Sequence, residues 1–350
     1  MPADAVRMPA EWAPHRACFT ALPHLADEWG ADLDDARDEV LALCRAIVDP
    51  DPTGGRPRGE PVDLLVRDRD QEALARRRLE GLPVRYHRIA YGDIWLRDTA
   101  PLFVHGDDGE RAVAFVFNGW GGKYRMPGDE GLAERLAAHL AVPVHRIPLV
   151  CEGGAVEVDG EGTCLTTRSC LRNPNRNPDL SEAEVTARLR EALGVERVVW
   201  LDGALANDHT DGHVDTLVRF VAPGVVLCME PVADDPNTRV LRGLIDGLVA
   251  ARDACGRRLE VHTVPSPGRV VDRRGTVMPA SYCNFYVGNA VVVVPTYGSP
   301  HDDTAVARIA ALFPGRRTVG LSARHILTGG GAFHCITQQR PTGVTGPDAP

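Results

Sequence analysis

The chain has 350 residues, of which 44% are hydrophobic and 25% charged, so it is long enough to bury the core of one or two globular domains. Its 39 Lys and Arg residues against 48 Asp and Glu residues give a net charge of −9. That balance argues against a nucleic-acid partner, because phosphate binding needs basic surfaces. The apolar runs are too short to cross a bilayer and no secretory signal is visible, so we expect a cytoplasmic protein without a membrane partner.

Segments with helical periodicity alternate with short apolar runs along the chain. Apolar residues at helical spacing predict helices at 33–48, 71–79, 130–140, 181–193, 239–254 and 302–313. Short apolar runs predict strands at 62–66, 113–117, 198–201, 214–220, 225–229 and 291–295. Ser181 and Glu184 form a capping-box pattern at the start of the fourth helix. This alternation predicts an α/β fold. We find no linker, so we expect one catalytic domain over 1–350 with a frayed tail from about residue 342.

Five polar or glycine-rich segments open directly into apolar runs. They lie at 97–101, 152–159, 207–215, 280–285 and 329–335. In the first four, the run is followed by a turn and a second strand, which is a hairpin pattern. The segments recur at intervals of roughly 50 to 70 residues, with a helix in each interval. Five similar units suggest closure around a centre that the polar segments face.

The cysteine count is nine, which excludes complete pairing into disulfides. The spacings contain no CxxC zinc pair, so most of these thiols are expected to be buried and inert. Cys335 differs from the others because it follows three glycines and His334. We predict that it is a nucleophile whose thiolate is favoured by nearby positive charge, such as that of a cationic substrate. Cys283 is a distant second candidate, and the remaining cysteines are expected to pack.

The densest polar segment contains His213 and Asp215. If it enters a strand after Gly212, these two side chains point to the same face, where they can bind a cation and move a proton. A metal site is an alternative, because His209 lies four residues before His213 and Asp211 lies between them. Histidine pairs at this spacing normally bind metal from a helix, and Gly212 in a polar turn disfavours one. We therefore expect no metal.

Two further carboxylates precede predicted strands. Glu152 is followed by two glycines, and Asp98 follows Trp95 in a segment that ends in a proline. Several carboxylates around one thiol suit a planar cation, because a guanidinium has N–H donors that carboxylates accept in pairs. A thiolate can attack the guanidinium carbon, and a histidine can protonate the departing ammonia and then activate water. The residues themselves therefore point to hydrolysis of a guanidino compound.

The chain resembles the agmatine deiminase family, within the guanidino-modifying enzymes that include arginine and peptidylarginine deiminases. The motifs that carry the resemblance are WLRDTAP, FNGWGGKY, EGGAVEVDGEGTCLTTRSCLRNPNRNP, NDHTDGHVD, SYCNFYVGN and GGGAFHCITQQRP. The resemblance implies a five-bladed pseudosymmetric α/β propeller of ββαβ-type units. It also implies hydrolysis of agmatine to N-carbamoylputrescine and ammonia, in putrescine biosynthesis, through a covalent thiouronium intermediate without metal or organic cofactor.

The resemblance also implies roles for individual residues. Cys335 is similar to the family nucleophile and His213 to its general acid/base. Asp98 and Asp215 match its guanidinium-binding carboxylates, and Glu152 matches the acid that orients the histidine and the guanidinium. Further residues expected near the substrate or the thiol are Trp95, Trp120, Gly330 and Gly331.

Several positions depart from the family pattern and leave the guanidino substrate open. The family commonly has Gly at the positions of Ala100 and Ala155, Asn at that of Asp211, and Asn-Ile at those of Ala332 and Phe333. The alternatives are therefore a deiminase of another guanidino compound, an amidinotransferase that uses the same thiol, a metallohydrolase, and a non-catalytic guanidine-binding protein. The expected partner is a small cationic guanidino compound, and a homodimer would be unsurprising.

Overall fold

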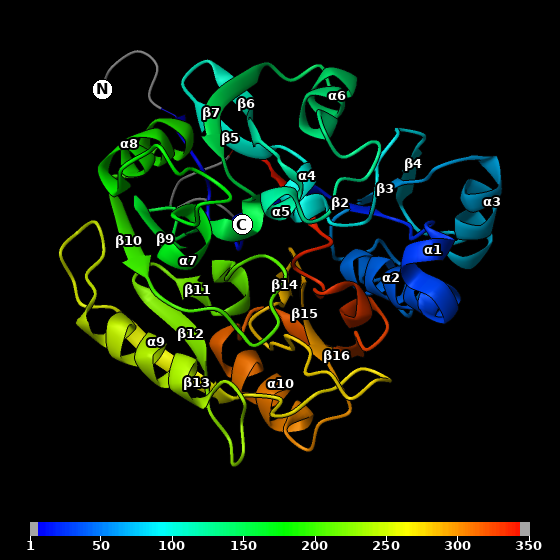
Figure 1. Ribbon diagram of the computed structural model, residues 1–350. Helices are drawn as coiled ribbons and strands as arrows, with labels where there is room; N and C mark the ends of the chain where they lie inside the picture. Colours follow the sequence, from blue (N-terminus) through cyan, green and yellow to red (C-terminus); the bar gives the residue numbers. More distant parts are fainter. Residues whose placement is uncertain (1–5, 344–350) are drawn as a thin grey trace.

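The computed structural model describes residues 6–343, which form an α/β structure with mixed parallel and antiparallel sheets. Figure 1 shows the strands arranged around the middle of the molecule and the longer helices farther out. The predicted α/β class is therefore confirmed.

Four sheets repeat one pattern, in which an antiparallel hairpin is followed by a helix and by a third strand parallel to the second. The hairpins predicted from the turns are thus present. The strands are β5 (Leu102–Gly106), β6 (Gly109–Val116) and β7 (Val144–Val150); β8 (Glu157–Val158), β9 (Thr163–Thr167) and β10 (Arg197–Leu201); β11 (Val218–Ala222), β12 (Val225–Glu230) and β13 (Glu260–Pro265); and β14 (Tyr286–Val287), β15 (Val291–Thr296) and β16 (Arg317–Ser322). The long helices between second and third strands are α6 (Leu132–His139), α8 (Glu182–Leu193), α9 (Thr238–Ala250) and α10 (Asp302–Leu312).

A fifth sheet joins the two ends of the chain in the same pattern. Strand β17 (Gln338–Pro341) pairs antiparallel with β2 (His15–Ala21), which is followed by helix α2 (Leu33–Val48) and the parallel strand β3 (Val62–Leu65). Helix α3 (Arg69–Arg78) then leads to strand β4 (Val84–His87), which pairs parallel with β3 and extends this sheet. The predicted frayed tail falls mainly on residues 344–350, outside the described residues. Thr342 donates its N–H to the carbonyl of Pro14, 2.8 Å away.

The polar segments all stand before the first strand of a sheet, in short irregular elements. Figure 1 places α4 (Leu96–Thr99) and α5 (Gly119–Gly122) near the middle of the view, with α7 (Arg168–Leu171) to their left. Both α4 and the 3-10 helix η3 (Val214–Thr216) contact the 3-10 helix η2 (Gly153–Ala155). The other short elements are β1 (Val6–Arg7), which pairs with β5, α1 (Ala26–Trp29), η1 (Gly30–Asp32) and η4 (Ile326–Gly329).

The bounds of several predicted elements differ from the structure, as for 113–117, where β6 already begins at Gly109, and two of the differences have a clear local cause. The strand expected at 214–220 begins only at Val218, because η3 occupies 214–216. There Leu217 donates its N–H to the Val214 carbonyl and the Thr216 hydroxyl donates to the His213 carbonyl, so the backbone turns before the strand starts. The helix expected at 239–254 ends at Ala250, because Ala251 is extended and the chain folds back on itself. The Ser181–Glu184 capping box of α8 is present as predicted.

Two clusters of buried apolar side chains form the core. The smaller packs the sheet of β5–β7 against α8, and its members include Val104, Ile147 and Leu189. Of the seven cysteines expected to pack, six are buried, but Cys255 is exposed and the prediction is wrong for it. Cys255 lies in the chain reversal after α9, in a turn where Gly256 donates to the Asp253 carbonyl, which keeps the thiol at the surface.

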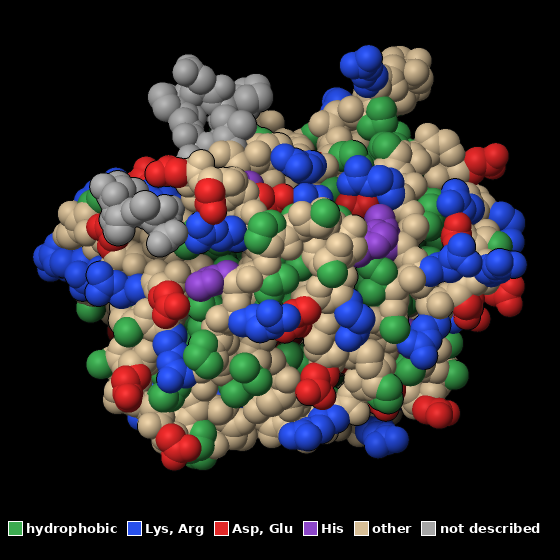
Figure 2. Space-filling model, turned by 90° about the horizontal axis from the view of Figure 1, so that it is seen from above, with side chains coloured by type: hydrophobic (Ala, Val, Ile, Leu, Met, Phe, Trp, Pro, Cys, Tyr) green, Lys and Arg blue, Asp and Glu red, His purple; other side chains and the backbone are tan. Residues whose placement is uncertain are grey.

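Charges of both signs are interspersed over the face shown in Figure 2. Within residues 6–343, no helix combines the length and the apolar character that crossing a membrane requires.

Candidate active site

A cavity of about 210 Å³ opens at the polar segments. Aromatic side chains form much of its wall, and a thiol and carboxyl-bearing residues complete it. Six of the site residues predicted from the sequence line this cavity, together with Trp29 and with Gly329, the first of the three glycines before the thiol. The predicted residues that line it are Trp95, Asp98, Trp120, Gly330, Gly331 and Cys335.

Cys335 follows η4 and a tight glycine turn. Asn284 holds this turn, because its Oδ1 accepts the N–H groups of Ala332 and Cys335, each at 3.2 Å. The Sγ of Cys335 lies 3.1 Å from Nδ2 of Asn284 and 3.6 Å from Oδ2 of Asp215. A Cβ on Gly331 would lie 2.7 Å from the Trp95 ring and 3.1 Å from this Sγ. Only glycine therefore lets the backbone pass between the thiol and the indole.

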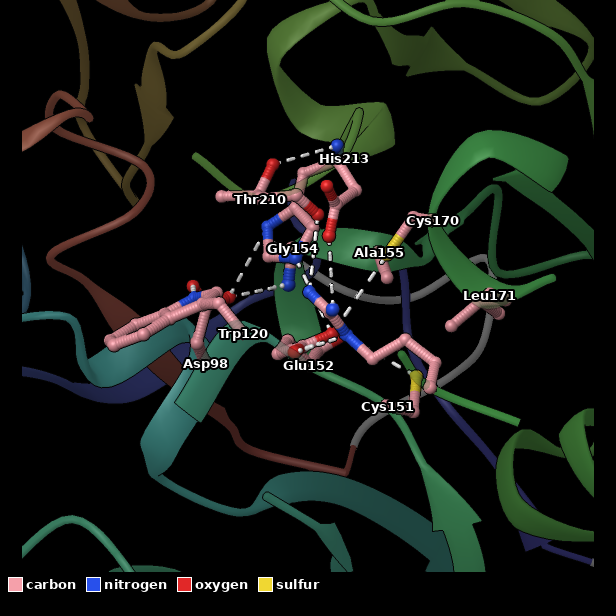
Figure 3. Close-up of polar contacts among 12 residues, drawn as sticks. Asp98, Trp120, Cys151, Glu152, Gly154, Ala155, Cys170, Leu171, Thr210 and His213 are labelled. Carbon is pink, nitrogen blue, oxygen red and sulfur yellow. Dashed lines mark hydrogen bonds and ion pairs between the residues drawn. The ribbon is translucent and has the colours of Figure 1, made fainter. Parts of the chain in front are cut away.

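Asp98 stands in α4 with both carboxylate oxygens held. Oδ1 accepts the backbone N–H of Gly154 at 3.0 Å, and Oδ2 accepts the indole N–H of Trp120 at 2.9 Å (Figure 3). Trp120 has a left-handed φ of 52°, and a Cβ on Gly121 would lie 2.4 Å from Arg176. This strained turn aims the Trp120 indole at Asp98.

His213 lies fully buried between two acids (Figure 3). Its Nδ1 is 3.7 Å from Oδ1 of Asp98, and its Nε2 is 3.5 Å from Oε2 of Glu152. Neither ring nitrogen has a hydrogen-bond partner among the described residues. A Cβ on Gly154 would lie 2.5 Å from Nδ1, so the glycine makes room for the ring.

Asp215 reaches the same site from η3 rather than from a strand. Strand alternation therefore does not bring it and His213 together. Instead, both side chains pack against the backbone of Gly154. A Cβ added to this glycine, which also makes room for the His213 ring, would lie 3.3 Å from Oδ2 of Asp215. Oδ2 accepts from His334 Nδ1 at 2.7 Å and from Asn284 Nδ2 at 3.2 Å. Oδ1 is buried without a hydrogen-bond partner in residues 6–343.

The charges of the site set the protonation of its histidine and thiol. Burial alone would lower the pKa of His213, but the negative charge of Asp98 and the contacts with Cys170 and Glu152 raise it well above its usual value. Burial raises the pKa of the Cys335 thiol well above its usual value, and Asp215 and Asp98 raise it further. With these protein groups, a protonated histidine thus accompanies a neutral thiol. The positive charge expected beside the thiol is not supplied by the nearest protein groups.

The three carboxylates differ in their pKa. Burial raises the pKa of Asp98, with His213 opposing it and Asp215 and Glu152 adding to it. Burial also acts to raise the pKa of Glu152 and of Asp215. Contacts with His213 and Arg176 together outweigh burial at Glu152, and those with His334, His213 and Arg219 together do so at Asp215, so both values are lowered. These two acids are therefore ionised at neutral pH.

A model of the Porphyromonas-type peptidyl-arginine deiminase family matches residues 7–341. The chain belongs to this family. It is 38% identical over 364 residues to an agmatine deiminase of Pseudomonas aeruginosa and 37% identical over 363 residues to one of Stutzerimonas stutzeri. Each alignment covers 97% of this chain and 96% of the relative. A solved agmatine deiminase of Enterococcus faecalis superposes with a TM-score of 0.89 at 31% identity, covering 97% of both chains.

Three further residues of the site, Arg176, Asn284 and His334, were not predicted from the sequence. Arg176 donates from Nε to Oε1 of Glu152 at 2.8 Å and is 4% exposed. Asn284 was noted only as part of a polar segment, and His334 only as the neighbour of Cys335. The signal that could have found Arg176 is the polar run RNPNRNP at 172–178, which is too long for a simple turn.

The alternative metal site does not assemble in this structure. His209 is exposed and stacks on Tyr124, 5.5 Å between ring centroids, while Asp211 pairs with Lys123 at 2.6 Å. A different trio has its ligand atoms within 4.8 Å of one another, namely Glu152, Cys170 and His213. The Arg176 guanidinium already occupies one oxygen of Glu152, and its charge opposes a second cation there.

Proposed function

We propose that this chain is a cysteine-dependent hydrolase that converts agmatine and water to N-carbamoylputrescine and ammonia. One observation carries the proposal: the Cys335 thiol and Asp98 line one aromatic-walled cavity, and the buried Asp215 and His213 lie 3.6 Å from that thiol and 3.7 Å from that carboxylate, respectively. Relatives of this chain that carry the name agmatine deiminase are 37 and 38% identical to it over nearly its full length.

Recognition of the substrate follows from the charges of the site. A guanidinium is planar and has N–H donors on three sides, so it can bridge several carboxylates at once. Asp215 has one oxygen free for this purpose, and Asp98 lines the cavity beside it. We assign Glu152 the role of orienting His213, which it contacts from the side away from Asp98. Trp95 and Trp120 would flank the alkyl chain.

The cation itself activates the nucleophile. Burial and the neighbouring Asp215 and Asp98 raise the pKa of Cys335, so among these protein groups the thiol keeps its proton. A bound guanidinium neutralises these carboxylates and stabilises the thiolate, and the thiol proton leaves to solvent. The thiolate thus forms only when its target is present.

The reaction then proceeds in two steps at one carbon. The Cys335 sulfur forms a bond to the guanidinium carbon, and the C–N bond to one terminal nitrogen breaks as His213 donates a proton, which releases ammonia and leaves a thiouronium on the enzyme. Water next attacks the same carbon and gives a proton to His213. The C–S bond then breaks and returns the thiolate, and the remaining hydroxyl proton leaves to solvent as the carbonyl of the released ureido product forms.

Ammonia release from agmatine tests this proposal. The wild-type chain is expected to release one ammonia per agmatine, and Cys335→Ser is expected to abolish the activity because the alcohol is a far weaker nucleophile at neutral pH. Cys255→Ser is the matched control, because this thiol is exposed and the variant should retain full activity. An active Cys335→Ser enzyme would refute the assignment of the nucleophile.

The product analysis also separates the alternatives. If the enzyme released ammonia from another guanidino compound but not from agmatine, the assigned substrate would change and the assigned reaction, deimination, would stay. Transfer of the amidino group to an added amine, without ammonia, would identify an amidinotransferase. The reason to test both is the local sequence: Asp211, Ala332 and Phe333 depart from the pattern of the family that the chain resembles.

We also propose that the five ββαβ sheets form a five-bladed pseudosymmetric propeller and that residues 1–350 are one catalytic domain. The support is that each sheet begins with a polar segment that contributes to the same site. Limited proteolysis that releases one stable fragment of nearly full length would agree with a single domain.

A cytoplasmic role in putrescine biosynthesis is part of the same proposal. Nine unpaired cysteines suit a reducing compartment. A homodimer is compatible with the family and is tested by sedimentation of the purified protein.

A further inference from the structure

His334, the neighbour of the thiol in sequence, bridges two carboxylates. Its Nδ1 lies 2.7 Å from Oδ2 of Asp215, and its Nε2 lies 2.7 Å from Oε2 of Glu11. The side chain is 1% exposed. Because both ring nitrogens are engaged by acids, neither is available to take a proton from Cys335.

This arrangement requires an imidazolium. A neutral imidazole has one N–H, and an ionised carboxylate only accepts hydrogen bonds, so two such bonds need two ring protons. Both acids are ionised. Burial would raise the pKa of Glu11, but Arg219, His334 and Arg97 hold it well below its usual value. The contact with His334 likewise lowers the pKa of Asp215 against its burial.

The imidazolium determines which oxygen of Asp215 is free. Oδ2 receives His334 at 2.7 Å and Asn284 at 3.2 Å, whereas Oδ1 has no donor within the described residues. A carboxylate that is anchored at one oxygen can present the other in a fixed direction. We infer that His334 is a positioning residue, a buried imidazolium that clamps Oδ2 of Asp215 and thereby aims Oδ1 at the substrate guanidinium. This inference rests on the proposed function for the identity of the cation.

The outer end of the bridge is Glu11, which lies in the turn between β1 and β2 and is held by two residues distant in sequence. Glu11 accepts from Nη2 of Arg219 at 2.6 Å through Oε2 and from the backbone N–H of Val287 at 2.8 Å through Oε1. Arg219 is itself fully buried and pairs with Glu157 at 3.0 Å. The ring of His334 is therefore fixed at both ends, and it has little freedom to rotate away from Asp215.

Other charged groups also influence Asp215 and His334, and they are unchanged in the variants proposed below except for Glu11. Those that face the pair are Glu11, Arg97, Asp98, Glu157, His213, Arg219 and Cys335. Removal of the His334 charge leaves Asp215 buried, with Asp98 as an acidic neighbour. The pKa of Asp215 should then rise, because the group that lowers it most is gone.

The test is the pH profile of His334→Gln. With agmatine as the probe, kcat/KM is expected to fall about 10- to 100-fold at neutral pH, mainly through KM, because the carboxylate is no longer aimed. The acid limb of the profile should move to higher pH by about one unit, since Asp215 takes up a proton more readily. An acid limb that stays in place would overturn the inference.

A matched control separates positioning from packing. His15 is also a buried histidine that contacts an acid, Glu60 at 3.1 Å, but it lies in β2. His15→Gln should lower the melting temperature without moving the acid limb. The same result for both variants would mean that His334 only packs.

A second measurement covers the case in which His334→Gln fails to fold. In the full-length chain labelled with ¹⁵N-histidine, His334 should show protons on both ring nitrogens at pH 7, and Glu11→Gln should perturb its signals most. A single N–H on that ring would overturn the inference. This readout needs no substrate, so it remains informative even if agmatine is not turned over, an outcome that would count against the proposed function alone.

Discussion

The amide of Asn284 holds Cys335 at two points, with Nδ2 3.1 Å from the sulfur and Oδ1 3.2 Å from the backbone N–H of the same residue. The hydrogen bond to the sulfur acts to lower the pKa of the thiol, against the larger opposite effects of burial and of Asp215 and Asp98. Asn284 therefore both places the sulfur and stabilises its thiolate.

Asn284→Asp should damage this arrangement without changing the size of the side chain. The new carboxylate replaces an N–H donor by a negative charge, so the pKa of Cys335 should rise further and the thiolate should form less readily. We expect kcat/KM to fall about 100-fold. Alkylation of the Cys335 peptide by iodoacetamide, followed by mass spectrometry, should require a higher pH than in the wild type.

The control is Asn207→Asp, the same substitution at an exposed position. Asn207 has a left-handed φ of 59°, which Asp also tolerates. Its rate and alkylation profile should match the wild type. Equal alkylation profiles for Asn284→Asp and wild type would argue against thiolate stabilisation by Asn284.

The side chains of His213, Asp98 and Asp215 all approach the α-carbon of Gly154. A Cβ there would lie 2.5 Å from Nδ1 of His213, 2.9 Å from Oδ1 of Asp98 and 3.3 Å from Oδ2 of Asp215. Gly154→Ala should therefore displace the histidine and lower kcat by at least about 100-fold. Overpacking of the buried site should also cost about 1–3 kcal/mol in free energy of unfolding.

Gly243→Ala is the control for Gly154→Ala, because it makes the same substitution at a helical position with open space around the added methyl group. It stands in α9, and an added Cβ would have no neighbour within 4 Å. This variant should keep full activity and gain up to about 1 kcal/mol of stability from helix propensity. If Gly154→Ala retained normal kcat, the tight contact among these groups would not govern catalysis.

Local sequence patterns could predict individual helices and hairpins of this fold, but not the pairing of strands that are distant in sequence. The periodicity of residues 33–48 gives the bounds of α2 correctly, and the turn at 107–109 marks the β5–β6 hairpin, because both depend on neighbouring residues. The pairing of β17 with β2 depends on residues more than 300 positions apart, as in the match of Gln338 with Phe19. No local pattern encodes that register.

The candidate site divides in the same way. Residues with reactive side chains next to glycines, such as Cys335 and Glu152, could be singled out from sequence. Glu11 could not, and the polar run at 172–178 marks the segment of Arg176 without its partner, because both residues act through buried acids or histidines that only folding brings near. His213 and Asp215 do meet, but through a 3-10 turn and a glycine on another segment rather than through strand alternation.

Arg176 should stabilise the fold by neutralising Glu152. Both side chains are fully buried, and Nε lies 2.8 Å from Oε1. Arg176→Gln leaves the buried acid with only the longer ion pair to His213, at 3.5 Å, which should cost about 3–5 kcal/mol in free energy of unfolding. The pKa of Glu152, now lowered by His213 and Arg176 against its burial, should rise in the variant.

Arg168→Gln serves as the control for Arg176→Gln. Arg168 pairs with Glu182 at 2.7 Å, but both side chains are about two-fifths exposed. Loss of this pair should cost no more than about 1 kcal/mol. Urea unfolding of both variants at pH 7 measures the contrast, and equal losses would contradict the special role of the buried pair.

Asp93 should govern the shape of the cavity wall, because it holds two indoles at once. Oδ1 accepts from Trp29 Nε1 and Oδ2 from Trp95 Nε1, each at 3.0 Å, and the two rings stack 6.1 Å apart. In Asp93→Asn the amide nitrogen must face one indole N–H, so one ring loses its acceptor. KM for agmatine should rise about 10-fold with a smaller change in kcat. Asp27→Asn, an exposed carboxylate two residues before Trp29, should leave KM unchanged.

The same variant makes a prediction about pH. Burial raises the pKa of Asp93 from 3.8 to about 6, although hydrogen bonds from Trp29, Ile94 and Trp95 oppose the shift. Between about pH 6 and pH 4 the folded wild type therefore binds a proton that the unfolded chain does not, so its stability relative to Asp93→Asn should increase as the pH falls. A shift of about two units corresponds to a gain of at most about 3 kcal/mol. Urea unfolding of both proteins at pH 7 and pH 4.5 measures this difference, and a constant difference would mean that Asp93 titrates normally.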